Sequence, residues 1–555
     1  MTDTLKIALA QLNPRVGDLA GNAVLLRDAR AKAATGNADL LLTSELMLVG
    51  YPPEDLVLRS AFQDAVAETI KSLAADTADG GPAVLLGAPW LDEADGTLHN
   101  AILLLQDGEI AAVRYKVDLP NYGVFDEMRV FVPGPLPEPI EFKGVKLGVP
   151  ICEDMWTPAV TNHLAAAGAE ILLVPNGSPF ETGKSNVRGD LARDRVSETG
   201  LPLAYVNQVG GQDELVFDGA SFVLNSDKSV ALNIAAWQED LVMSTWQRGD
   251  KGWTCDEGDK AEAPGELEDI WFAMVVGLRD YVNKNGFPGV VMGMSGGIDS
   301  ALSAAVAVDA LGPDKVHCIM LPSKFTGDES FTDAKACAEA LGARYDNMPI
   351  KPAVDTYSDM LADMFAGREA DTTEENIQAR IRAVTLMALS NKFGAMLLTT
   401  GNKSEMSVGY ATLYGDMCGG FSVLKDVYKT TVFELSHWRN DNLPRGVLGP
   451  GGEVIPENII VKPPTAELRE DQKDQDSLPS YDELDDMLRC LVEDEMSFED
   501  IVERGHSPAD VARIENLLYI AEYKRRQAPP GVKIGGKNFG RDRRYPITNR
   551  FRDAP

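Results

Sequence analysis

One stretch of this chain, VVMGMSGGIDSALSAAVAVDAL, constrains the fold more than any other. Residues 290–294 have the pattern of a buried strand, SGGIDS that of a glycine turn, and the Ala-rich run up to Leu311 that of a helix. A strand–turn–helix unit directs backbone N–H groups and the positive end of the helix dipole at a bound anion. Gly296 and Gly297 leave room for a phosphate to approach the backbone. The stretch predicts a nucleotide-binding α/β domain, and the alternative is a tight turn with a capping serine.

The polar residues of this turn suit phosphate chemistry. Ser295 and Ser300 offer hydroxyl donors, and Asp299 is suited to hold a magnesium ion that bridges phosphates. No GxxxxGK[ST] motif occurs in the chain, so this is not a P-loop of the γ-phosphate-cleaving kind. SGGIDS resembles the signature of the N-type ATP pyrophosphatases, which adenylate a carboxylate or carbonyl and release pyrophosphate. The resemblance implies that ATP binds Gly293, Met294, Ser295, Gly296, Gly297, Ile298, Asp299 and Ser300, with Thr400 near the nucleotide.

The length of 555 residues predicts two or more domains. Up to residue 233, short apolar runs alternate with Ala-rich helical segments such as 22–35, which is typical of an α/β domain. The strands expected there are 6–11, 40–43, 83–88, 101–105, 145–150, 171–175, 203–207 and 220–224. Residues 234–265 are rich in charges and poor in periodicity, and we expect a linker there.

A second α/β unit is expected over residues 266–555. It begins with an amphipathic helix, LEDIWFAMVVGLRDYVNKNG, and continues through the SGGIDS turn. Strands at 316–321 and 395–400, with a helix around 333–341, predict a doubly wound parallel sheet. In such a sheet the ligand lies at the carboxyl ends of the strands. The last hundred residues are polar, are expected to be mostly helical, and end in a Gly- and Arg-rich tail.

Composition excludes several classes of protein. No run of 18 apolar residues occurs and the first residues lack the features of a signal peptide, so we expect a cytoplasmic protein without a membrane partner. The formal net charge of −33 disfavours nucleic-acid binding. The six scattered cysteines form no CxxC pair, which argues against a disulfide framework or structural zinc. The tail GRDRRYPITNRFRD is interrupted by acids, and salt bridges between subunits or a substrate lid explain it better than nucleic acid does.

The first half of the chain contains a second set of chemically suggestive segments. They are LLLTSELMLVGYPPEDL with Glu45, RYKVDLPNYGVFDE with Lys116, and LGVPICEDMW with Cys152. In the first and third, a polar residue follows an apolar strand directly, where side chains reach a site rather than a core. A cysteine beside a cation has a depressed pKa, a glutamate accepts its proton, and a lysine stabilises an oxyanion. From the residues alone, a buried structural cysteine is the competing interpretation.

The three segments resemble, in order and context, the Glu–Lys–Cys triad of the nitrilase (carbon–nitrogen hydrolase) superfamily. Together with SGGIDS they resemble the glutamine-dependent NAD+ synthetases over nearly the full length. Long strings carry this resemblance: TTGNKSEMSVGYATLYGDMCGG, LKDVYKTTVFELSHW, PPTAELREDQKDQDSLPSYDELD and YKRRQAPPGVKIGGKNFGRDRRYPITNRF. The resemblance implies a nitrilase-like α-β-β-α sandwich followed by a doubly wound ATP pyrophosphatase domain.

The resemblance also implies two reactions. Cys152 attacks the side-chain amide of glutamine, with Glu45 as general base and Lys116 at the oxyanion, and releases ammonia. In the second domain ATP adenylates the carboxylate of deamido-NAD, and ammonia then displaces AMP. Glutamine contacts are implied for Tyr122, Ser178 and Lys184; deamido-NAD contacts for Asn376, Arg380, Glu405, Asp416 and Lys524; and magnesium contacts for Asp299 and Glu405.

Several of these residues have competing interpretations. Lys184 could be exposed to solvent, Tyr122 could be a packed aromatic, and Glu405 could be a helix cap. Asp416 and Lys425 are further candidates that could equally be structural. The family implies a homo-oligomer, and we expect a sequestered tunnel that carries ammonia from one site to the other.

Three rival functions remain open at this stage. The first is another ATP-pyrophosphatase amidotransferase, against which the Glu–Lys–Cys set counts. The second is an amidase whose second half has become a regulatory nucleotide-binding domain. The third is a nucleotide sensor without catalytic activity, which the joint presence of Cys152, Glu45, Lys116, Ser295 and Asp299 disfavours.

Overall fold

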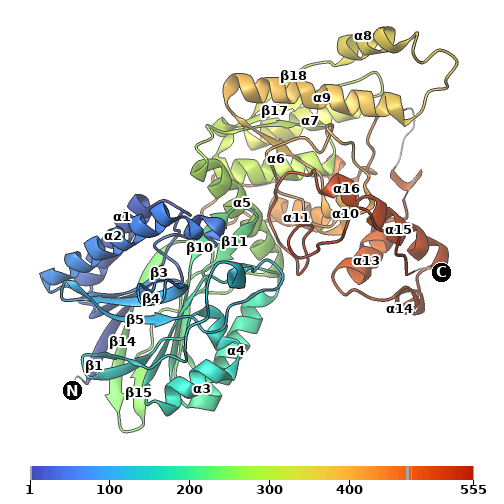
Figure 1. Cartoon of the computed structure of the whole chain (residues 1–555). Helices are drawn as coiled ribbons and strands as arrows, with labels where there is room; N and C mark the ends of the chain where they lie inside the picture. The colour runs from blue at the N-terminus through green and yellow to red at the C-terminus, as the bar shows by residue number, and fades with distance from the viewer. Residues whose placement is uncertain (1–2, 470–473, 477, 554–555) are drawn as a thin grey trace. The chain divides into compact units, whose positions relative to one another are not determined.

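The chain folds into two compact units, Met1–Gly265 and Glu266–Pro555, shown in Figure 1. The computed structural model describes residues 3–469, 474–476 and 478–553, so five residues of the string quoted from 463 to 485 lie outside the described part. Among the described residues, no helix is long and apolar enough to cross a membrane.

The first unit contains two β-sheets. A seven-stranded sheet has the order β15-β14-β1-β2-β3-β4-β5, and a six-stranded sheet has the order β13-β12-β9-β8-β7-β6. The strands of the first sheet are β1 (Thr4–Gln11), β2 (Leu40–Leu42), β3 (Ala83–Leu91), β4 (Leu98–Gln106), β5 (Glu109–Tyr115), β14 (Asp240–Gly249) and β15 (Gly252–Cys255). Those of the second are β6 (Ile140–Phe142), β7 (Val145–Gly148), β8 (Ile171–Asn176), β9 (Leu203–Asn207), β12 (Phe222–Leu224) and β13 (Val230–Asn233). A separate hairpin pairs β10 (Val209–Gln212) with β11 (Leu215–Asp218).

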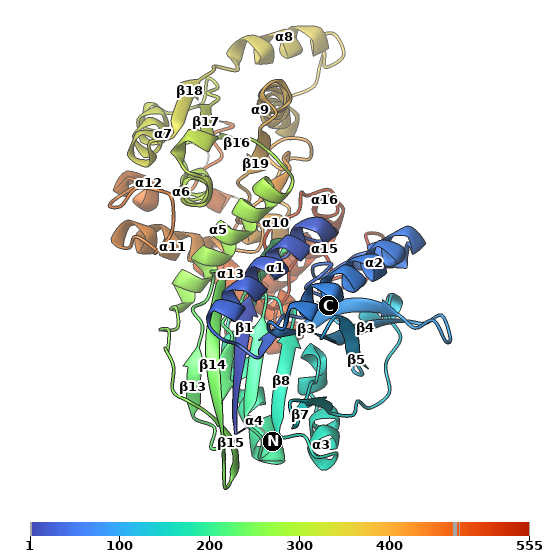
Figure 2. The same cartoon turned by 90° about the vertical axis from the view of Figure 1, so that its left-hand side faces the viewer.

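Alternation along the strands explains how these sheets stack. Leu5, Ile7 and Leu9 of β1 pack in a cluster with inward residues of β7, β8 and β9, whereas Ala8 and Ala10 pack on the opposite side. Because successive side chains of a strand point to opposite faces, one face of the sheet meets the second sheet and the other meets helices. The helices are α1 (Leu19–Thr35) and α2 (Ser60–Asp76) on the first sheet and α3 (Pro158–Ala166) and α4 (Lys184–Thr199) on the second. Figure 2 shows α1 and α2 beside the strands that they cover. The expected α-β-β-α sandwich is confirmed.

The expected linker at 234–265 is not a linker in the structure. Residues 240–249 form β14, which runs antiparallel to β1. All of β1 pairs with it, from Thr4 opposite Gln247 to Gln11 opposite Asp240. Strand β15 then pairs with β14 at the edge of the sheet. Only two of the ten residues of β14 are fully buried, and polar and charged side chains interrupt the apolar alternation that marks a strand in sequence.

The second unit contains a parallel five-stranded sheet of order β18-β17-β16-β19-β20. The strands are β16 (Val290–Gly293), β17 (Val316–Met320), β18 (Arg344–Asn347), β19 (Met396–Thr399) and β20 (Phe421–Ser422). Helices α5 (Glu266–Lys284), α6 (Ile298–Leu311), α7 (Asp328–Leu341), α8 (Lys351–Leu361) and α9 (Thr372–Phe393) accompany this sheet. Helices α10 (Lys403–Val408), α11 (Lys429–Asp441), α12 (Glu457–Val461), α13 (Tyr481–Val492), α14 (Phe498–Glu503), α15 (Pro508–Ile520) and α16 (Glu522–Arg525) follow.

The strand order identifies where a ligand binds in this sheet. Strand β16 pairs with β17 on one side and with β19 on the other, so the order reverses at β16. A crevice opens outside the carboxyl ends of the strands at such a reversal. The SGGIDS turn leaves β16 at this end, so the expected doubly wound sheet is confirmed together with the expected position of the turn.

Candidate active sites

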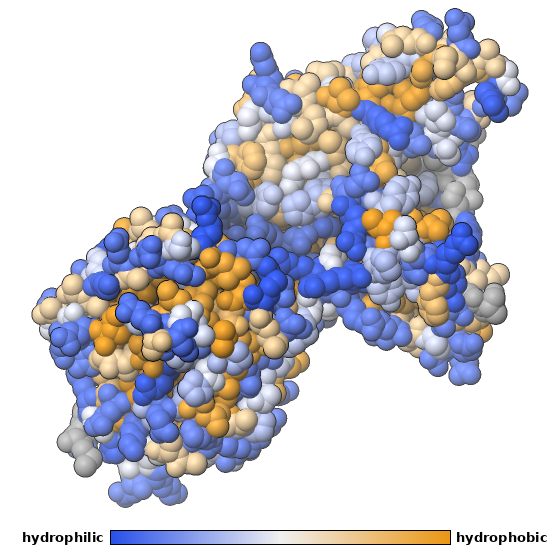
Figure 3. All heavy atoms as spheres, in the orientation of Figure 1, coloured by the Kyte–Doolittle hydropathy of each residue, from blue (hydrophilic) through white to orange (hydrophobic). Residues whose placement is uncertain are grey.

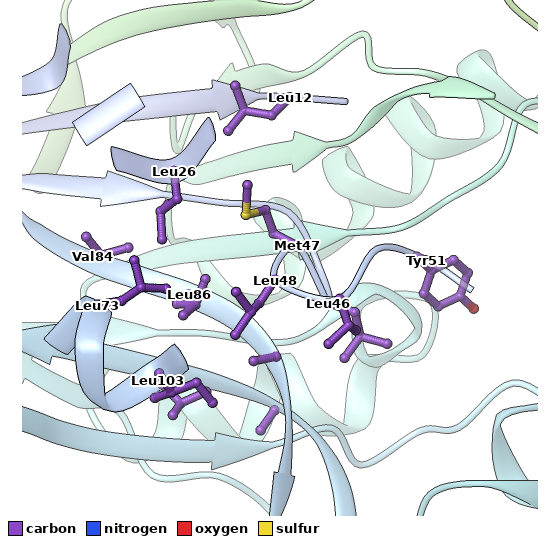
Figure 4. Close-up of a cluster of buried hydrophobic side chains, with 14 of the residues drawn as sticks. Leu12, Leu26, Leu46, Met47, Leu48, Tyr51, Leu73, Val84, Leu86 and Leu103 are labelled. Carbon is purple, nitrogen blue, oxygen red and sulfur yellow. The ribbon is translucent and has the colours of Figure 1, made fainter. Parts of the chain in front are cut away.

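Glu45 lies three residues beyond the carboxyl end of β2, the central strand of the first sheet, and is fully buried. The residues that follow it, Leu46 to Val49, are buried in the apolar cluster shown in Figure 4 together with Leu26 and Leu86. A Cβ atom at Gly87 would lie 2.3 Å from the carbonyl oxygen of Ser44, so only glycine lets β3 approach this segment. Packing on both sides therefore fixes the backbone that carries Glu45.

Lys116 follows β5 directly and its side chain is fully buried. Its Nζ donates to Glu45 Oε1 at 2.7 Å and to both carboxylate oxygens of Glu127, at 2.8 and 3.0 Å. Burial alone lowers the pKa of this ammonium, but the charges of Glu127 and Glu45 outweigh burial and raise the pKa well above its usual value. Lys116 is therefore a fixed cation beside Glu45.

Cys152 opens a 3-10 helix, Cys152–Met155, at the end of a buried segment that follows β7. Its φ of +48° belongs to the left-handed region, where a residue with a side chain is strained. The expectation of a depressed pKa is wrong, because burial, reinforced by the charge of Glu45, raises the pKa of the thiol well above its usual value. Lys116 acts in the opposite direction without reversing the shift. The side chain is therefore a thiol at neutral pH, and attack by sulfur needs a base.

Two buried residues of this site escaped the sequence analysis. Glu127 accepts hydrogen bonds from Lys116 and from the hydroxyl of Tyr51, the latter at 2.8 Å. Asn100 Nδ2 donates to Glu45 Oε1 at 2.7 Å and to Glu127 Oε2 at 3.3 Å. Glu127 ends the same segment that carries Lys116, and a second carboxylate in that segment was the signal available. The first site therefore has two glutamates around one lysine.

Tyr122 and Lys184 lie near the loop that carries Cys152. The Tyr122 hydroxyl donates to Glu153 Oε1 at 2.9 Å, and its side chain is exposed, so it is not a packed core aromatic. Lys184 begins α4 and is half-buried, with Nζ 5.5 Å from the ring centroid of Phe125 and 5.9 Å from that of Trp156. A cation over two aromatic rings beside a carboxylate is suited to a small zwitterion.

Ser178 is positioned by Arg188, which forms a buried ion pair with Asp218. The Arg188 Nε donates to Ser178 Oγ at 3.1 Å, and one Nη of Arg188 donates to both oxygens of Asp218, at 2.7 and 2.8 Å. The other Nη donates to the backbone oxygens of Ser178 and Pro179. Sequence reasoning did not single out this pair, because its partners are thirty residues apart.

The SGGIDS turn in the second unit has the expected shape. Gly296 has φ +82°, and a Cβ there would lie 2.4 Å from the carbonyl oxygen of Ser330, so the position requires glycine. The hydroxyls of Ser295 and Ser300 lie 3.1 Å apart, and Ser300 Oγ donates to the Gly297 oxygen at 2.8 Å. Helix α6 begins at the next residue, so its N-terminal amides face the turn.

A cavity of about 300 Å³ opens beside this turn, and all the residues expected to bind ATP and magnesium line it. All of Gly293 to Ser300 line it, with Thr400, Glu405, Asp416 and Lys425. Asp299 Oδ1 accepts from Asn402 Nδ2 at 2.9 Å, and Asp299 Oδ2 forms an ion pair with Lys429. Lys429 Nζ also lies 3.6 Å from Glu405 Oε1. The sequence analysis singled out Lys425 and missed Lys429, which begins α11 four residues further along.

Asn376, Arg380 and Lys524 do not line this cavity among its described residues, but they converge on one loop. Asn376 Oδ1 accepts from Thr412 Oγ1 at 2.8 Å, and Arg380 Nε donates to the Leu413 oxygen at 3.2 Å. Lys524 Nζ donates to two further carbonyls of the loop, those of residues 409 and 411, both at 2.7 Å. The loop joins α10 to Asp416, so these residues surround one border of the cavity.

Glu405 is both a helix-cap residue and a cavity residue. Its carboxylate faces the Asn402 backbone N–H in a capping box at the start of α10, which is the competing interpretation given above. It also lines the cavity, where burial and the like charge of Asp299 raise the pKa of this carboxyl to about 8. Among the described residues no ready-made cluster of three or more metal-ligating side chains is present.

Comparison with known proteins agrees with this division. Residues 6–252 match the family model described as carbon-nitrogen hydrolase, and residues 270–528 match the one described as NAD synthase. The chain is 52% identical to a glutamine-dependent NAD(+) synthetase of Rhodobacter capsulatus, and the match covers 100% of each chain. It is 42% identical to a glutamine-dependent NAD(+) synthetase of Thermotoga maritima, and that match covers 99% of each chain. A structure of glutamine-dependent NAD+ synthetase from Acinetobacter baumannii in complex with ADP matches with a TM-score of 0.78 and 40% identity, over 98% of this chain and 99% of that one.

The fold and the two sites thus define a two-domain enzyme that joins a carbon–nitrogen hydrolase domain to an NAD synthase domain. Relatives match both domains from end to end, which argues against another amidotransferase or a regulated amidase. The chain belongs to the glutamine-dependent NAD(+) synthetase family.

Proposed function

We propose that this protein hydrolyses glutamine at Cys152 and uses the ammonia to convert deamido-NAD to NAD+ at the expense of ATP. The observation that carries the proposal is the presence of two complete sites, each within its own unit. One is the buried Glu45–Lys116 pair beside Cys152. The other is the SGGIDS turn, which lines a cavity with Asp299, Glu405 and Lys429.

In the first site the groups perform amide hydrolysis as follows. Glu45 takes the Cys152 proton as sulfur attacks the amide carbon, because the raised pKa leaves no preformed thiolate. Lys116 Nζ stabilises the oxyanion of the tetrahedral intermediate. Glu45 then returns the proton to the departing nitrogen, which leaves as ammonia, and the same carboxylate activates the water that hydrolyses the thioester.

The rim of this site selects glutamine through its two charges. Lys184 binds the α-carboxylate, and Glu153, whose side chain already accepts from Tyr122, binds the α-ammonium. Ser178, held by Arg188, binds the side-chain amide. Opposite charges, from Glu153 in the cysteine loop and Lys184 at the start of α4, favour a free amino acid over a neutral amide.

In the second site the carboxylate of deamido-NAD attacks the α-phosphorus of ATP and pyrophosphate leaves. Ammonia then attacks the adenylated carbonyl, and AMP leaves as the amide forms. The backbone N–H groups of the SGGIDS turn and Lys429 hold the phosphates. Asn376, Arg380, Asp416 and Lys524 hold deamido-NAD, and Thr400 contacts the nucleotide.

Asp299 and Glu405 are the residues that would hold Mg2+. They fit the ion, because carboxylate oxygens are its preferred ligands and it uses few protein ligands beside substrate phosphates. Mg2+ neutralises phosphate charge when bound. The Lys429 ammonium forms an ion pair with Asp299 and lies 3.6 Å from Glu405 Oε1, so it contributes positive charge to the same place.

We further propose a homo-oligomeric cytoplasmic enzyme. Figure 3 shows hydrophobic residues gathered where Figure 1 places α8 and α9. The exposed apolar side chains of this region include Tyr357, Met360 and Met364, the last 81% exposed. A second copy of the chain covering them explains this surface, and light scattering of the purified protein measures the assembly.

A product assay with ATP, Mg2+ and deamido-NAD tests the main proposal. Wild type should form NAD+ from either glutamine or ammonium, whereas Cys152→Ala should form it from ammonium alone. The buried Cys255→Ala, in the same unit, controls for loss of a thiol and should behave as wild type. Failure of wild type to make NAD+ from either donor would refute the proposal.

Equal glutamine hydrolysis with and without ATP and deamido-NAD would refute coupling between the sites.

A further inference from the structure

Arg382 lies on the face of α9 that covers the SGGIDS strand. A Cβ at Gly293, the last residue of β16, would lie 3.5 Å from Leu386 Cδ1, so Leu386 packs on the start of the turn. Arg382 precedes Leu386 by one helical turn and shares its face. It lines the same cavity as all residues from Gly293 to Ser300. The sequence analysis assigned no role to this arginine.

Hydrogen bonds leave most of this guanidinium available. Arg382 Nε donates to the carbonyl oxygen of Leu321, just beyond β17, at 3.0 Å. Within the described part of the chain this is the one hydrogen bond of the side chain, and no ion pair to it is described. An arginine also carries N–H donors on both Nη atoms. The bond to Leu321 therefore orients the group and leaves both Nη atoms for a ligand.

The surroundings of Arg382 favour an anionic ligand. The side chain is half-buried, and desolvation lowers the pKa of the guanidinium, while the charges of Glu467 and Asp416 act in the opposite direction. Other buried arginines of this chain have close carboxylates: Arg188 pairs with Asp218 and Arg439 with Asp309. Because an arginine is charged at any ordinary pH, a half-buried one without such a partner is stabilised when an oxyanion binds.

We propose that Arg382 binds a phosphate of ATP, opposite the backbone amides of the SGGIDS turn. A planar guanidinium with two free Nη groups donates to two oxygens of one phosphate. The hydrogen bond from Nε to the Leu321 carbonyl fixes the position of the guanidinium relative to the end of β17. The phosphate is then held between α9 and the turn. The inference rests on ATP being the substrate of this unit.

Calorimetry on the full-length protein tests this contact. Binding of ATP with Mg2+, of AMP and of adenosine is measured for wild type, Arg382→Met and Arg382→Lys. Arg344→Met is the matched control, since Arg344 is exposed on β18 and pairs with Asp346 away from the cavity. Circular dichroism melting and glutamine hydrolysis report whether each variant is folded.

We expect Arg382→Met to raise the Kd for ATP by about tenfold or more, with adenosine binding unchanged. A similar rise for AMP assigns the contact to the α-phosphate, and unchanged AMP binding assigns it to the β- or γ-phosphate. Arg382→Lys should be intermediate, because lysine keeps the charge but loses the two-point contact. Unchanged ATP affinity in a folded Arg382→Met would overturn the inference, and so would an equal loss of adenosine binding, which places the guanidinium at the base. If Arg382→Met does not fold, Arg382→Lys with wild-type ATP affinity overturns it.

Different results would refute the proposed function and this inference. Wild type that binds no ATP, or makes no NAD+ from ammonium, refutes the function. Wild type that does both, with Arg382 variants that bind ATP normally, refutes the inference alone.

Discussion

Lys116 Nζ contacts both carboxylate oxygens of Glu127, at 2.8 and 3.0 Å, in addition to its single contact with Glu45. Glu127 thus contacts the ammonium with two oxygens, whereas Glu45 contacts it with Oε1 alone. The other oxygen of Glu45, Oε2, accepts a hydrogen bond from the Gly177 amide at 2.9 Å. The lysine is oriented by one glutamate while the other serves as the base.

Glu127→Gln should therefore reduce glutamine hydrolysis without changing substrate binding. The amide keeps the size of the side chain but removes a charge that stabilises Lys116, so we expect kcat to fall about 10²-fold with little change in KM. NAD+ formation from ammonium should be unaffected. Glu68→Gln on the exposed face of α2 is the matched control. A kcat within the range of that control would show that Glu127 does not position Lys116.

Arg188→Met should destabilise the first unit and weaken glutamine binding. It leaves Asp218 buried without its partner, which costs about 3–5 kcal/mol. It also frees Ser178, so KM for glutamine should rise more than kcat falls. Thermal melting and steady-state kinetics measure the two effects. Arg193→Met, which removes an exposed arginine from the same helix, should change neither. A lower melting temperature with unchanged KM would assign Arg188 a purely structural role.

Magnesium binding should strengthen as pH rises through about 8, the value to which burial and Asp299 raise the pKa of Glu405. Below that pH the carboxyl is protonated and neutral, and a proton must leave before it can bind the cation. Affinity should fall by up to about tenfold per pH unit below the pKa. Calorimetric titration of Mg2+ into the protein with ATP and no ammonium measures this. Glu405→Gln should bind more weakly and with a flat pH profile; a wild-type profile equally flat would contradict the assignment.

Lys403→Met should abolish NAD+ formation from ammonium while sparing glutamine hydrolysis. Lys403, fully buried at the start of α10, contacts Asp426 at 2.7 Å, Glu493, and the carbonyl of Lys537 at 2.8 Å. Removing the cation leaves two carboxylates without compensation and costs about 3–5 kcal/mol. The first turn of α10 also carries Glu405, so its displacement disturbs the cavity. Lys392→Met, at an exposed lysine of α9, is the control. Normal NAD+ formation by a folded Lys403→Met would contradict this role.

The sequence predicted the elements whose burial is continuous. The Ala- and Leu-rich strands β1, β3, β4, β8 and β9 are present where expected, because each contains a continuous buried apolar run. The SGGIDS turn is also present where expected, because the left-handed φ of Gly296 requires glycine. The sequence did not predict β14, because partial burial on the strand weakens the pattern. Pairing between residues more than two hundred positions apart has no local signal.

The candidate sites were predicted where a motif carries them and missed where only spatial contact does. Cys152, Glu45 and Lys116 were found through the context of three segments. Glu127 and Lys429 have meaning only through what they touch: the ammonium of Lys116 for one, and Asp299 for the other. The pKa of Cys152 depends on the balance between burial and neighbouring charges, and composition does not reveal that balance.

The pairing of β1 with β14 also has a consequence for synthesis of the chain. Strand β1 leaves the ribosome well before β14, so it meets one of its two neighbours, β2, within about thirty residues but the other only after residue 249 has emerged. Until then one edge of a largely apolar strand has no hydrogen-bonding partner, and such edges invite pairing with other chains. Completion of the glutaminase unit is thus delayed until almost all of it has been made, and this interval is when the nascent protein depends most on protection from aggregation.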